Sequence, residues 1–314
     1  MIFCKKKVAV CILTYNRIKL LKKSIDSVLN SFSTDFQLFV FDNCSTDGTK
    51  DFLDILHEKK LLYTVSHNVN IEVGNNANFI LDNLIAKYCL MLHDDDILEP
   101  QYIEEVLRIA ESDDNIAIVG TGYNTIDEND KKTGEIIYKK FREPVIFTDR
   151  DYFYHQINGL SFPWSGTLIN MKKVNNFRFD YSSHPICCDT IFISNIVVKN
   201  RVGYIPKLLM NYRISKYQAT QSWNFEFLFK EWNYNFYFYK ELIIKNNYGK
   251  DMLKNITKAN TKTLLYLLTI APDYKYYFKI LNSEYFNFLS LNPKKYFIII
   301  RKFFRLLLKN KQIE

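Results

Sequence analysis

Residues Val8–Arg17 read VAVCILTYNR: six apolar residues, then a polar or aromatic stretch that ends in a cation. A short, uninterrupted apolar run is typical of a strand buried on both faces of a sheet. The residues from Ile18 to Phe32 then place apolar side chains at helical spacing, with lysines between them. A buried strand that leads directly into an amphipathic helix predicts the first half of a strand–helix–strand unit.

The same alternation continues outward from this stretch through the first 120 residues. Apolar runs predict four further strands, at 36–41, 61–65, 88–92 and 116–119. Between them, apolar periodicity predicts helices over 47–58, over 77–85 and from Pro100 onward. This order predicts an α/β fold with a mostly parallel, doubly wound central sheet flanked by helices.

Polar residues follow each of the first four predicted strands. They are Thr14–Arg17, Asp42–Thr49, His67–Asn70 and His93–Asp96. In sheets of this kind ligands bind beyond the carboxyl ends of the strands. We therefore expect these four segments to converge on one binding rim.

The charge of the chain is concentrated at its end. The formal net charge is +8, but residues 292–314 hold seven basic residues and one acidic residue, so the remaining chain is close to neutral. A protein that binds nucleic acid through a basic groove usually carries its charge on the folded face. The distribution therefore argues against a nucleic-acid partner.

The six cysteines form neither a CxxC pair nor a spaced framework, which argues against zinc ligation and structural disulfides. The first residues lack the apolar core of a signal peptide. The longest apolar runs are far shorter than the roughly 20 residues that span a bilayer. These features predict a reduced, cytoplasmic protein.

Three consecutive aspartates, Asp94 to Asp96, end the predicted strand at 88–92. Adjacent carboxylates repel one another at a sheet edge, where the local dielectric is low, so a cation should offset them. Hard oxygen ligands favour Mg²⁺ or Mn²⁺, shared with substrate phosphates. The alternative is an acidic loop that caps the helix at Pro100, although one acid would suffice for that.

Three other rim residues suit a nucleotide. Asp42 can accept a bond from a base imide, Tyr15 can stack on that base, and Arg17 can meet phosphate. The plain alternatives are a capping turn for Asp42 and a solvated helix cation for Arg17. No GxGxxG follows a predicted strand and no GxxxxGK[ST] or GxSxG is present, which argues against dinucleotide oxidoreductases, P-loop enzymes and serine hydrolases.

Three segments together resemble the family 2 glycosyltransferases with the GT-A fold: VAVCILTYNR, VFDNCSTDGT and LMLHDDDILEP. The resemblance covers about Lys7 to Ser215. It implies a nucleotide-sugar donor, a divalent metal and inversion at the anomeric carbon. The chain departs from the family at Leu13, where many members have Pro, at Asn43, where many have a second Asp, and in lacking an arginine before Asn78.

Carried over by position, the resemblance implies a role for each matching residue. Thr14, Tyr15 and Arg17 would belong to the nucleotide pocket, and Asp42 would bind the base, typically uracil. Asp94 would lie on the ribose side. Asp95 would bind the metal, with Asp96 as a second ligand. Asn78 remains a candidate for contact with the donor.

The inverting reaction needs a carboxylate that takes the proton of the acceptor hydroxyl. The family usually places it in a Glu-Asp pair about ninety residues after the metal motif; here Cys188-Asp189 stands at that distance, at the head of an apolar helix. We therefore expect Asp189 to be the catalytic base. A helix cap is its structural alternative, and Asp180 is the second candidate for the base.

Three residues of the second half are candidates for the remaining contacts. Trp164 could stack on an acceptor sugar, although a buried structural tryptophan is the alternative. His184 is either an acceptor-side residue or a loop histidine. Arg213 begins a polar stretch that could close over the donor diphosphate and offset its charge.

The last ninety residues are helical and aromatic in pattern. Residues 292–312 place basic side chains on one stripe of a predicted helix, which suits a membrane interface with anionic lipid. The alternatives are a terminal helix docked on its own domain and a contact in a homodimer. We expect a catalytic domain over residues 1–222, with a nucleotide-binding half (1–120) and an acceptor half (121–222), and a helical region over 223–314.

The sequence thus predicts a metal-dependent inverting glycosyltransferase. Its donor would be a nucleotide sugar, which the resemblance implies is a UDP-sugar. Its acceptor would be a hydroxyl of a lipid-linked oligosaccharide or a bacterial surface polysaccharide such as capsule or lipopolysaccharide, reached at the inner face of the cytoplasmic membrane. A noncatalytic glycan- or membrane-binding protein with the same fold is the alternative. A sugar nucleotidyltransferase would need a glycine-rich loop after the first strand, which Thr14–Arg17 is not.

Overall fold

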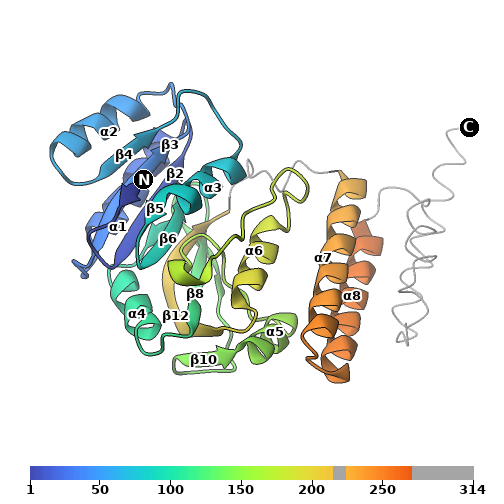
Figure 1. Cartoon of the computed structure of the whole chain (residues 1–314). Helices are drawn as coiled ribbons and strands as arrows, with labels where there is room; N and C mark the ends of the chain where they lie inside the picture. The colour runs from blue at the N-terminus through green and yellow to red at the C-terminus, as the bar shows by residue number, and fades with distance from the viewer. Residues whose placement is uncertain (215–223, 271–314) are drawn as a thin grey trace, which may run out of the picture. The chain divides into compact units, whose positions relative to one another are not determined.

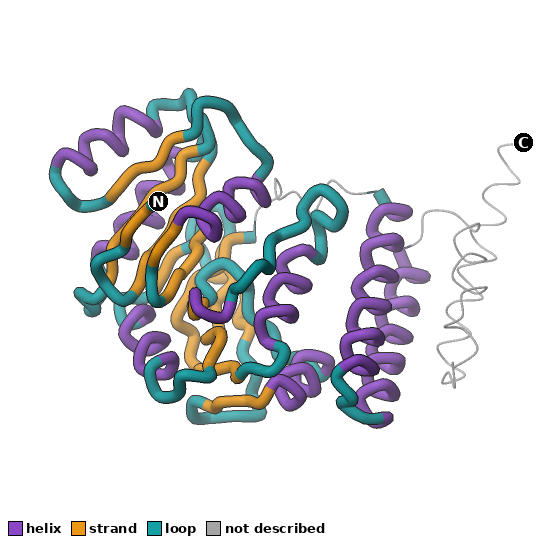
Figure 2. Tube along the Cα trace, in the orientation of Figure 1, coloured by secondary structure: helices purple, strands orange, loops and turns teal. Residues whose placement is uncertain are grey.

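The computed structural model describes residues 1–214 and 224–270 of the chain (Figure 1). Two compact units make up the chain, Met1–Gln221 and Ser222–Glu314. The described strands all lie in the first unit, whereas the described part of the second consists of two long helices (Figure 2).

The first half of the large sheet is parallel, as the alternation of apolar runs and helices predicts. Four strands lie side by side in the order β4-β3-β2-β6. They are β2 (Val8–Thr14), β3 (Phe36–Asp42), β4 (Tyr63–Ser66) and β6 (Tyr88–His93). The helices that connect or follow them are α1 (Ile18–Leu29), α2 (Thr49–Glu58), α3 (Val73–Asn83) and α4 (Tyr102–Ala110).

Helices cover the sheet on both sides, which explains why β2 is apolar along almost its whole length (Figure 1). Alternate side chains of β2, from Val8 to Ile12, pack in one core cluster with residues of α1 and α4. On the opposite face of the sheet, Phe41 of β3 meets Phe79 of α3 edge to face, with ring centroids 6.4 Å apart. A strand enclosed in this way has no solvent face on which a polar residue would be favoured.

The second half of the sheet is mixed. A short strand, β11 (Leu168–Asn170), runs antiparallel between β6 and β8 (Ile116–Ile126), and β8 pairs in parallel with β12 (Arg201–Arg213). The predicted strand at 116–119 therefore continues to Ile126. The remaining partners are β7 (Ile97–Leu98), β9 (Lys132–Ile136) and β10 (Val145–Thr148), all antiparallel.

Gly120 lies inside β8 rather than in a phosphate-binding turn. A Cβ at this position would lie 2.4 Å from the ring of Phe162, so only glycine leaves room for that ring. Shorter elements complete the first unit. They are β1 (Ile2–Phe3) paired with β5 (Leu84–Ile85), α5 (Asp149–Ile157), the 3₁₀ turn η1 (Met171–Lys173) and α6 (Cys188–Val197).

The described part of the second unit contains α7 (Phe225–Lys245) and α8 (Lys250–Ile270). Asn224 caps α7, because its side-chain oxygen accepts a hydrogen bond from the backbone N–H of Phe227 at 2.9 Å. Among the described helices, none has the length and apolar character needed to cross a membrane. The basic segment 292–312 lies outside the described residues.

Candidate active site

The ends of three parallel strands meet at one rim. Thr14, the last residue of β2, pairs in register with Asp42 at the end of β3, and Leu13 pairs with His93 at the end of β6. Because parallel strands carry their carboxyl ends to the same edge, residues from three separate segments become neighbours. The structure thus brings Thr14, Asp42 and Asp94 together.

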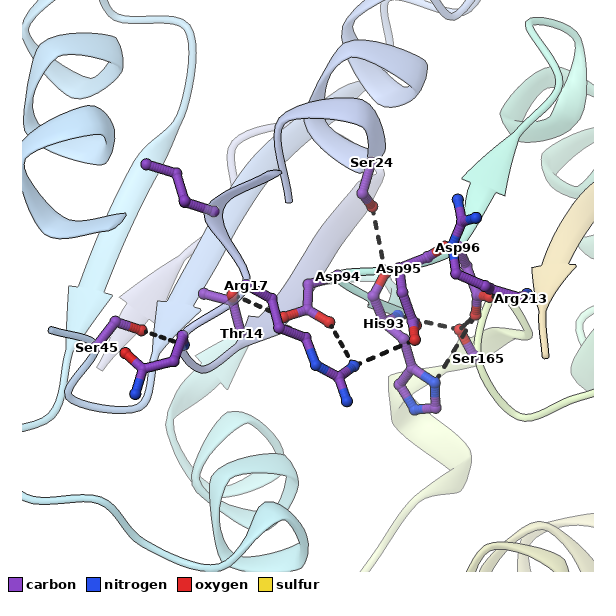
Figure 3. Close-up of polar contacts among 12 residues, drawn as sticks. Thr14, Arg17, Ser24, Ser45, His93, Asp94, Asp95, Asp96, Ser165 and Arg213 are labelled. Atoms are coloured by element: carbon purple, nitrogen blue, oxygen red, sulfur yellow. Dashed lines mark hydrogen bonds and ion pairs between the residues drawn. The ribbon is translucent and has the colours of Figure 1, made fainter. Parts of the chain in front are cut away.

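Asp94 and Asp95 share one cationic partner. A guanidinium nitrogen of Arg17, Nη1, lies 3.2 Å from a carboxylate oxygen of each aspartate (Figure 3). The hydroxyl of Thr14 also donates to Asp94 at 2.8 Å. Burial raises the pKa of Asp94 to about 6, although the charge of Arg17 opposes this rise. The acidic loop, residues 94–96, therefore holds charge that burial disfavours and that an exposed cation partly offsets.

Asp96 has a different environment from its two neighbours. It is fully buried, and both of its carboxylate oxygens accept hydrogen bonds, one from the hydroxyl of Ser165 at 2.6 Å and one from the backbone N–H of Arg213 at 2.9 Å. The Ser165 hydroxyl oxygen in turn accepts from the backbone N–H of His93 at 3.0 Å. Burial, and next the charge of Asp95, raise the pKa of Asp96. Ser165 is a site residue that the sequence did not single out.

Arg213 is buried against the acidic loop. Its side chain is only 1% exposed, and its Nε donates to the backbone oxygen of Asp95 at 2.9 Å. The rest of the guanidinium pairs with the carboxylate of Asp130 at 2.5 Å and with the backbone oxygen of Asp127. Arg213 thus binds the acidic loop from inside the protein, and its predicted contact with the donor diphosphate stays a prediction.

Asn78 is also engaged elsewhere. Its side-chain nitrogen donates to the backbone oxygen of Phe179 at 2.9 Å, and its oxygen accepts from the backbone N–H of the same residue at 2.8 Å. Both ends of the amide thus pin α3 to the segment before α6. The structure gives Asn78 this linking role, and its predicted contact with the donor stays a prediction.

Three side chains at the acidic loop fit a divalent cation. Potential ligand atoms of His93, Asp95 and Asp96 all lie within 4.8 Å of one another. Carboxylate oxygens and an imidazole nitrogen suit Mn²⁺ and Mg²⁺. Of the two acids, Asp95 is the better placed, because both oxygens of Asp96 already accept hydrogen bonds within the protein.

The nucleotide side of the rim is built from two interlocked loops. Asp42 is buried, and its carboxylate accepts from the backbone N–H of Ser45 at 3.2 Å. Asn16, in the left-handed backbone region at φ 51°, donates its N–H to the Ser45 hydroxyl at 2.9 Å and accepts from the N–H of Thr46 at 2.7 Å. Beside this locked pair of loops, Tyr15 keeps 42% of its surface exposed, as a stacking residue requires.

Trp164 lies beside the acidic loop. Its ring meets that of His93 edge to face, with centroids 5.2 Å apart, and contacts Phe179 at 5.0 Å. The side chain is only partly buried. This position suits the predicted acceptor contact, which stays a prediction.

Asp189 lies in the first turn of α6, where its carboxylate accepts from the backbone N–H of Thr190 at 2.6 Å. Burial raises the pKa of Asp189. Asp189 also acts on the phenol of Tyr212. Burial raises the pKa of Tyr212, and the charges of Asp96, Asp95 and Asp189 raise it further. The charges of Asp189 and of the acidic loop thus act on the same phenol.

The two remaining candidates lie in the turn before α6. Asp180, the second candidate for the base, uses one carboxylate oxygen to accept from the hydroxyl of Ser182 and the N–H of Ser183, at 3.2 and 3.1 Å. His184 closes that turn by donating its backbone N–H to the oxygen of Asp180 at 3.0 Å. An acceptor role for His184 stays a prediction.

Comparison with known proteins identifies the family. The profile of glycosyl transferase family 2 matches residues 9–192, more than half of the chain. The chain belongs to glycosyltransferase family 2. The predicted family and enzyme class are thus confirmed, and inversion is characteristic of this family.

Two relatives of this glycosyltransferase illustrate how far the similarity extends. An uncharacterized glycosyltransferase of Haemophilus influenzae is 24% identical over 319 residues, which cover 95% of this chain and 96% of that protein. An uncharacterized glycosyltransferase of Rickettsia felis is 29% identical over 210 residues, 67% of this chain but only 33% of that protein. The chain therefore spans nearly all of the first relative and about a third of the second.

Solved structures confirm the GT-A fold of this family 2 glycosyltransferase. Residues 1–349 of Staphylococcus aureus TarS, in complex with UDP-GlcNAc, match with a TM-score of 0.61 at 14% identity, covering 85% of this chain and 82% of that one. The mannosyltransferase PcManGT of Pyrobaculum calidifontis, in complex with GDP-Man and Mn²⁺, matches with a TM-score of 0.57 at 14% identity, covering 85% and 72%.

Proposed function

We propose that this glycosyltransferase moves a sugar from a UDP-sugar to a hydroxyl of a lipid-linked oligosaccharide or a bacterial surface polysaccharide, and that it depends on a divalent metal. The observation that carries the donor side is the cluster at the rim, where Arg17 bridges Asp94 and Asp95. The nucleotide sugars bound to TarS and PcManGT, and the Mn²⁺ bound to the latter, support this proposal.

Each rim residue has one task in the proposed donor site. Tyr15 stacks on the base and Asp42 accepts its imide N–H. Thr14 holds Asp94, which lies on the ribose side. Arg17, the exposed cation, meets the diphosphate. A divalent metal held by Asp95, with Asp96 in the same group, would offset the charge that develops on the leaving diphosphate.

The acceptor side uses Asp189. Its carboxylate takes the proton of the acceptor hydroxyl as that oxygen attacks the anomeric carbon. Burial raises its pKa and so makes it a stronger base than an ordinary aspartate. Trp164 lies beside the acidic loop and stacks on the acceptor sugar.

The proposed acceptor and location rest on sequence. A basic amphipathic segment at 292–312, which lies outside the described residues, would bring the enzyme to anionic lipid at the inner face of the cytoplasmic membrane. A lipid-linked glycan is a substrate that requires such a position. The noncatalytic alternative is not favoured, because the chain belongs to a family of transferases.

The test is a screen of UDP- and GDP-sugars for hydrolysis and transfer, with wild type, Asp95→Ala and Asp189→Ala. We expect hydrolysis of one UDP-sugar in a metal-dependent manner and its loss in both variants. Asp189→Ala should still bind UDP with Mn²⁺, whereas Asp95→Ala should lose the metal dependence. Full activity in either variant would reject that residue's role, and preference for a GDP-sugar would reject the uridine donor.

A further inference from the structure

The exposed turn between β8 and β9 is held by several hydrogen bonds among its own residues. The carboxylate of Asp127 accepts from the backbone N–H groups of Asn129 and Lys131, at 2.8 and 3.0 Å. The backbone of Asp127 also closes the turn, donating to the oxygen of Lys131 at 3.0 Å and accepting from the N–H of Asp130 at 3.2 Å. These bonds hold Asp127, Asn129, Asp130 and Lys131 in the turn.

The backbone of Asp130 adopts a left-handed conformation in this turn. Its φ of 64° lies in the left-handed region, which side chains other than those of Asn and Asp rarely adopt. In this conformation its carboxylate forms ion pairs with Arg213, at 2.5 Å, and with Lys23 of α1. Burial raises the pKa of Asp130, but Lys23 and Arg213 outweigh it and lower the pKa overall, so the carboxylate is charged at neutral pH.

Arg213 connects this turn to the acidic loop. The guanidinium meets Asp130 and the backbone oxygen of Asp127 on one side, and its Nε donates to the backbone oxygen of Asp95 on the other. The backbone N–H of Arg213 donates to the carboxylate of Asp96. Arg213 therefore links Asp130 to Asp95 and Asp96, two adjacent residues of the acidic loop.

The two arginines at the loop act differently. Arg17 is 43% exposed and pairs with the side-chain carboxylates of Asp94 and Asp95, so an incoming cation can displace it and a phosphate can compete for it. Arg213 is buried and touches the backbone of Asp95, which ligands do not replace. A buried guanidinium is stable only while its charge is compensated, and within residues 1–214 and 224–270 the carboxylate of Asp130 pairs with the Arg213 side chain at 2.5 Å.

We propose that Asp130 is a positioning residue of the metal site: it fixes Arg213, and Arg213 fixes the backbone of Asp95 and the carboxylate of Asp96. This role rests on the proposed function, in which these aspartates hold the metal. Groups behind metal ligands orient them, and their loss typically weakens metal binding about 10- to 100-fold.

The test compares Mn²⁺ binding by wild type, Asp130→Asn and Asp130→Gly, measured by calorimetry or electron paramagnetic resonance without donor. Both replacements tolerate the positive φ, glycine without strain, so the turn can be kept while the carboxylate is lost. The matched control is Asp113→Asn, which removes the partner of Arg201, an exposed arginine at the other end of β12 with an ion pair of 2.7 Å.

We expect Mn²⁺ affinity to fall about 10-fold in both Asp130 variants and to stay within about twofold of wild type in Asp113→Asn. UDP binding in EDTA should be unchanged in all of them, because Tyr15 follows β2 and Asp42 ends β3, whereas Asp130 lies in the turn between β8 and β9. Wild-type Mn²⁺ affinity in the Asp130 variants, or an equal loss of Mn²⁺ and metal-free UDP binding, would overturn the positioning role. If wild type itself binds no Mn²⁺, the proposed metal dependence fails and the positioning role fails with it.

Discussion

Ser165 donates a 2.6 Å hydrogen bond to Asp96 although 69 residues separate them in the chain. Both side chains are fully buried. The bond joins the loop before β11 to the loop after β6, two antiparallel neighbours in the sheet. Burial raises the pKa of Asp96, and the hydrogen bond from Ser165 lowers it, so Ser165 favours the ionised form of Asp96.

Replacing Ser165 by Ala should therefore destabilise the protein and weaken its metal site. We expect a loss of about 1–3 kcal/mol in the free energy of unfolding, the range for a buried polar group deprived of its partner. Denaturant unfolding and Mn²⁺ titration measure the two effects. Ser112→Ala is the control, because the Ser112 hydroxyl donates to a backbone oxygen at the end of α4. Equal effects in the two variants would contradict the role of Ser165.

Arg17 and a bound metal should compete for Asp95. In Arg17→Met, Asp94 and Asp95 lose the guanidinium that pairs with them. Mn²⁺ alone should therefore bind more tightly, by up to about fivefold, which is the upper range for a partly exposed ion pair. Affinity for UDP should fall, because the cation proposed to meet the diphosphate is gone. Calorimetry with each ligand separates the two effects.

The control for Arg17 is Arg108→Met, which removes an exposed arginine paired with Glu105 at 2.8 Å. It should leave both affinities at wild-type values. A decrease in Mn²⁺ affinity in Arg17→Met would mean that the guanidinium supports the metal rather than competes with it.

Gly120→Ala should destabilise the first unit by about 1–3 kcal/mol, the usual cost of overpacking. The added Cβ would lie 2.4 Å from the ring of Phe162. In the double variant with Phe162→Ala the clash disappears, so the two effects should not add. Thermal and denaturant unfolding of the four proteins give the coupling, and strict additivity would show that the ring moves aside without cost.

The sequence predicts the nucleotide half well for physical reasons. Strands enclosed between helices must be largely apolar, so β2 and β6 begin as uninterrupted apolar runs and β3 is interrupted by Gln37 alone before its terminal Asp42. Parallel pairing then forces their carboxyl ends together, and Thr14, Asp42 and Asp94 become neighbours without further information.

Contacts made across long separations could not be predicted in the same way. Arg213 meets Asp95 and Asp96 from more than a hundred residues away, and no local pattern distinguishes an arginine that binds phosphate from one buried against its own backbone. The residues of β11 are strand-like in sequence, but no local pattern gives the place between β6 and β8 or the antiparallel direction by which this strand makes the sheet mixed. Tertiary packing decides such features.

Asp189→Asn should abolish transfer and at the same time stabilise the protein. Loss of a general base costs about 10²- to 10⁴-fold in rate. Burial raises the folded-state pKa of Asp189 above its unfolded value, so the ionised form destabilises the folded protein at neutral pH, and this cost vanishes below the unfolded pKa.

The melting temperature of Asp189→Asn should therefore exceed that of wild type at pH 7, and the difference should shrink as the pH falls through the folded pKa toward the unfolded one. Transfer by wild type should decline over the same range as Asp189 takes up its proton. Asp180→Asn is the control: the pKa of Asp180 is lowered overall because hydrogen bonds from Ser183 and Ser182 outweigh its burial, so this variant should lose stability at neutral pH and keep its activity. The opposite pattern, an active Asp189→Asn and an inactive Asp180→Asn, would assign the base to Asp180.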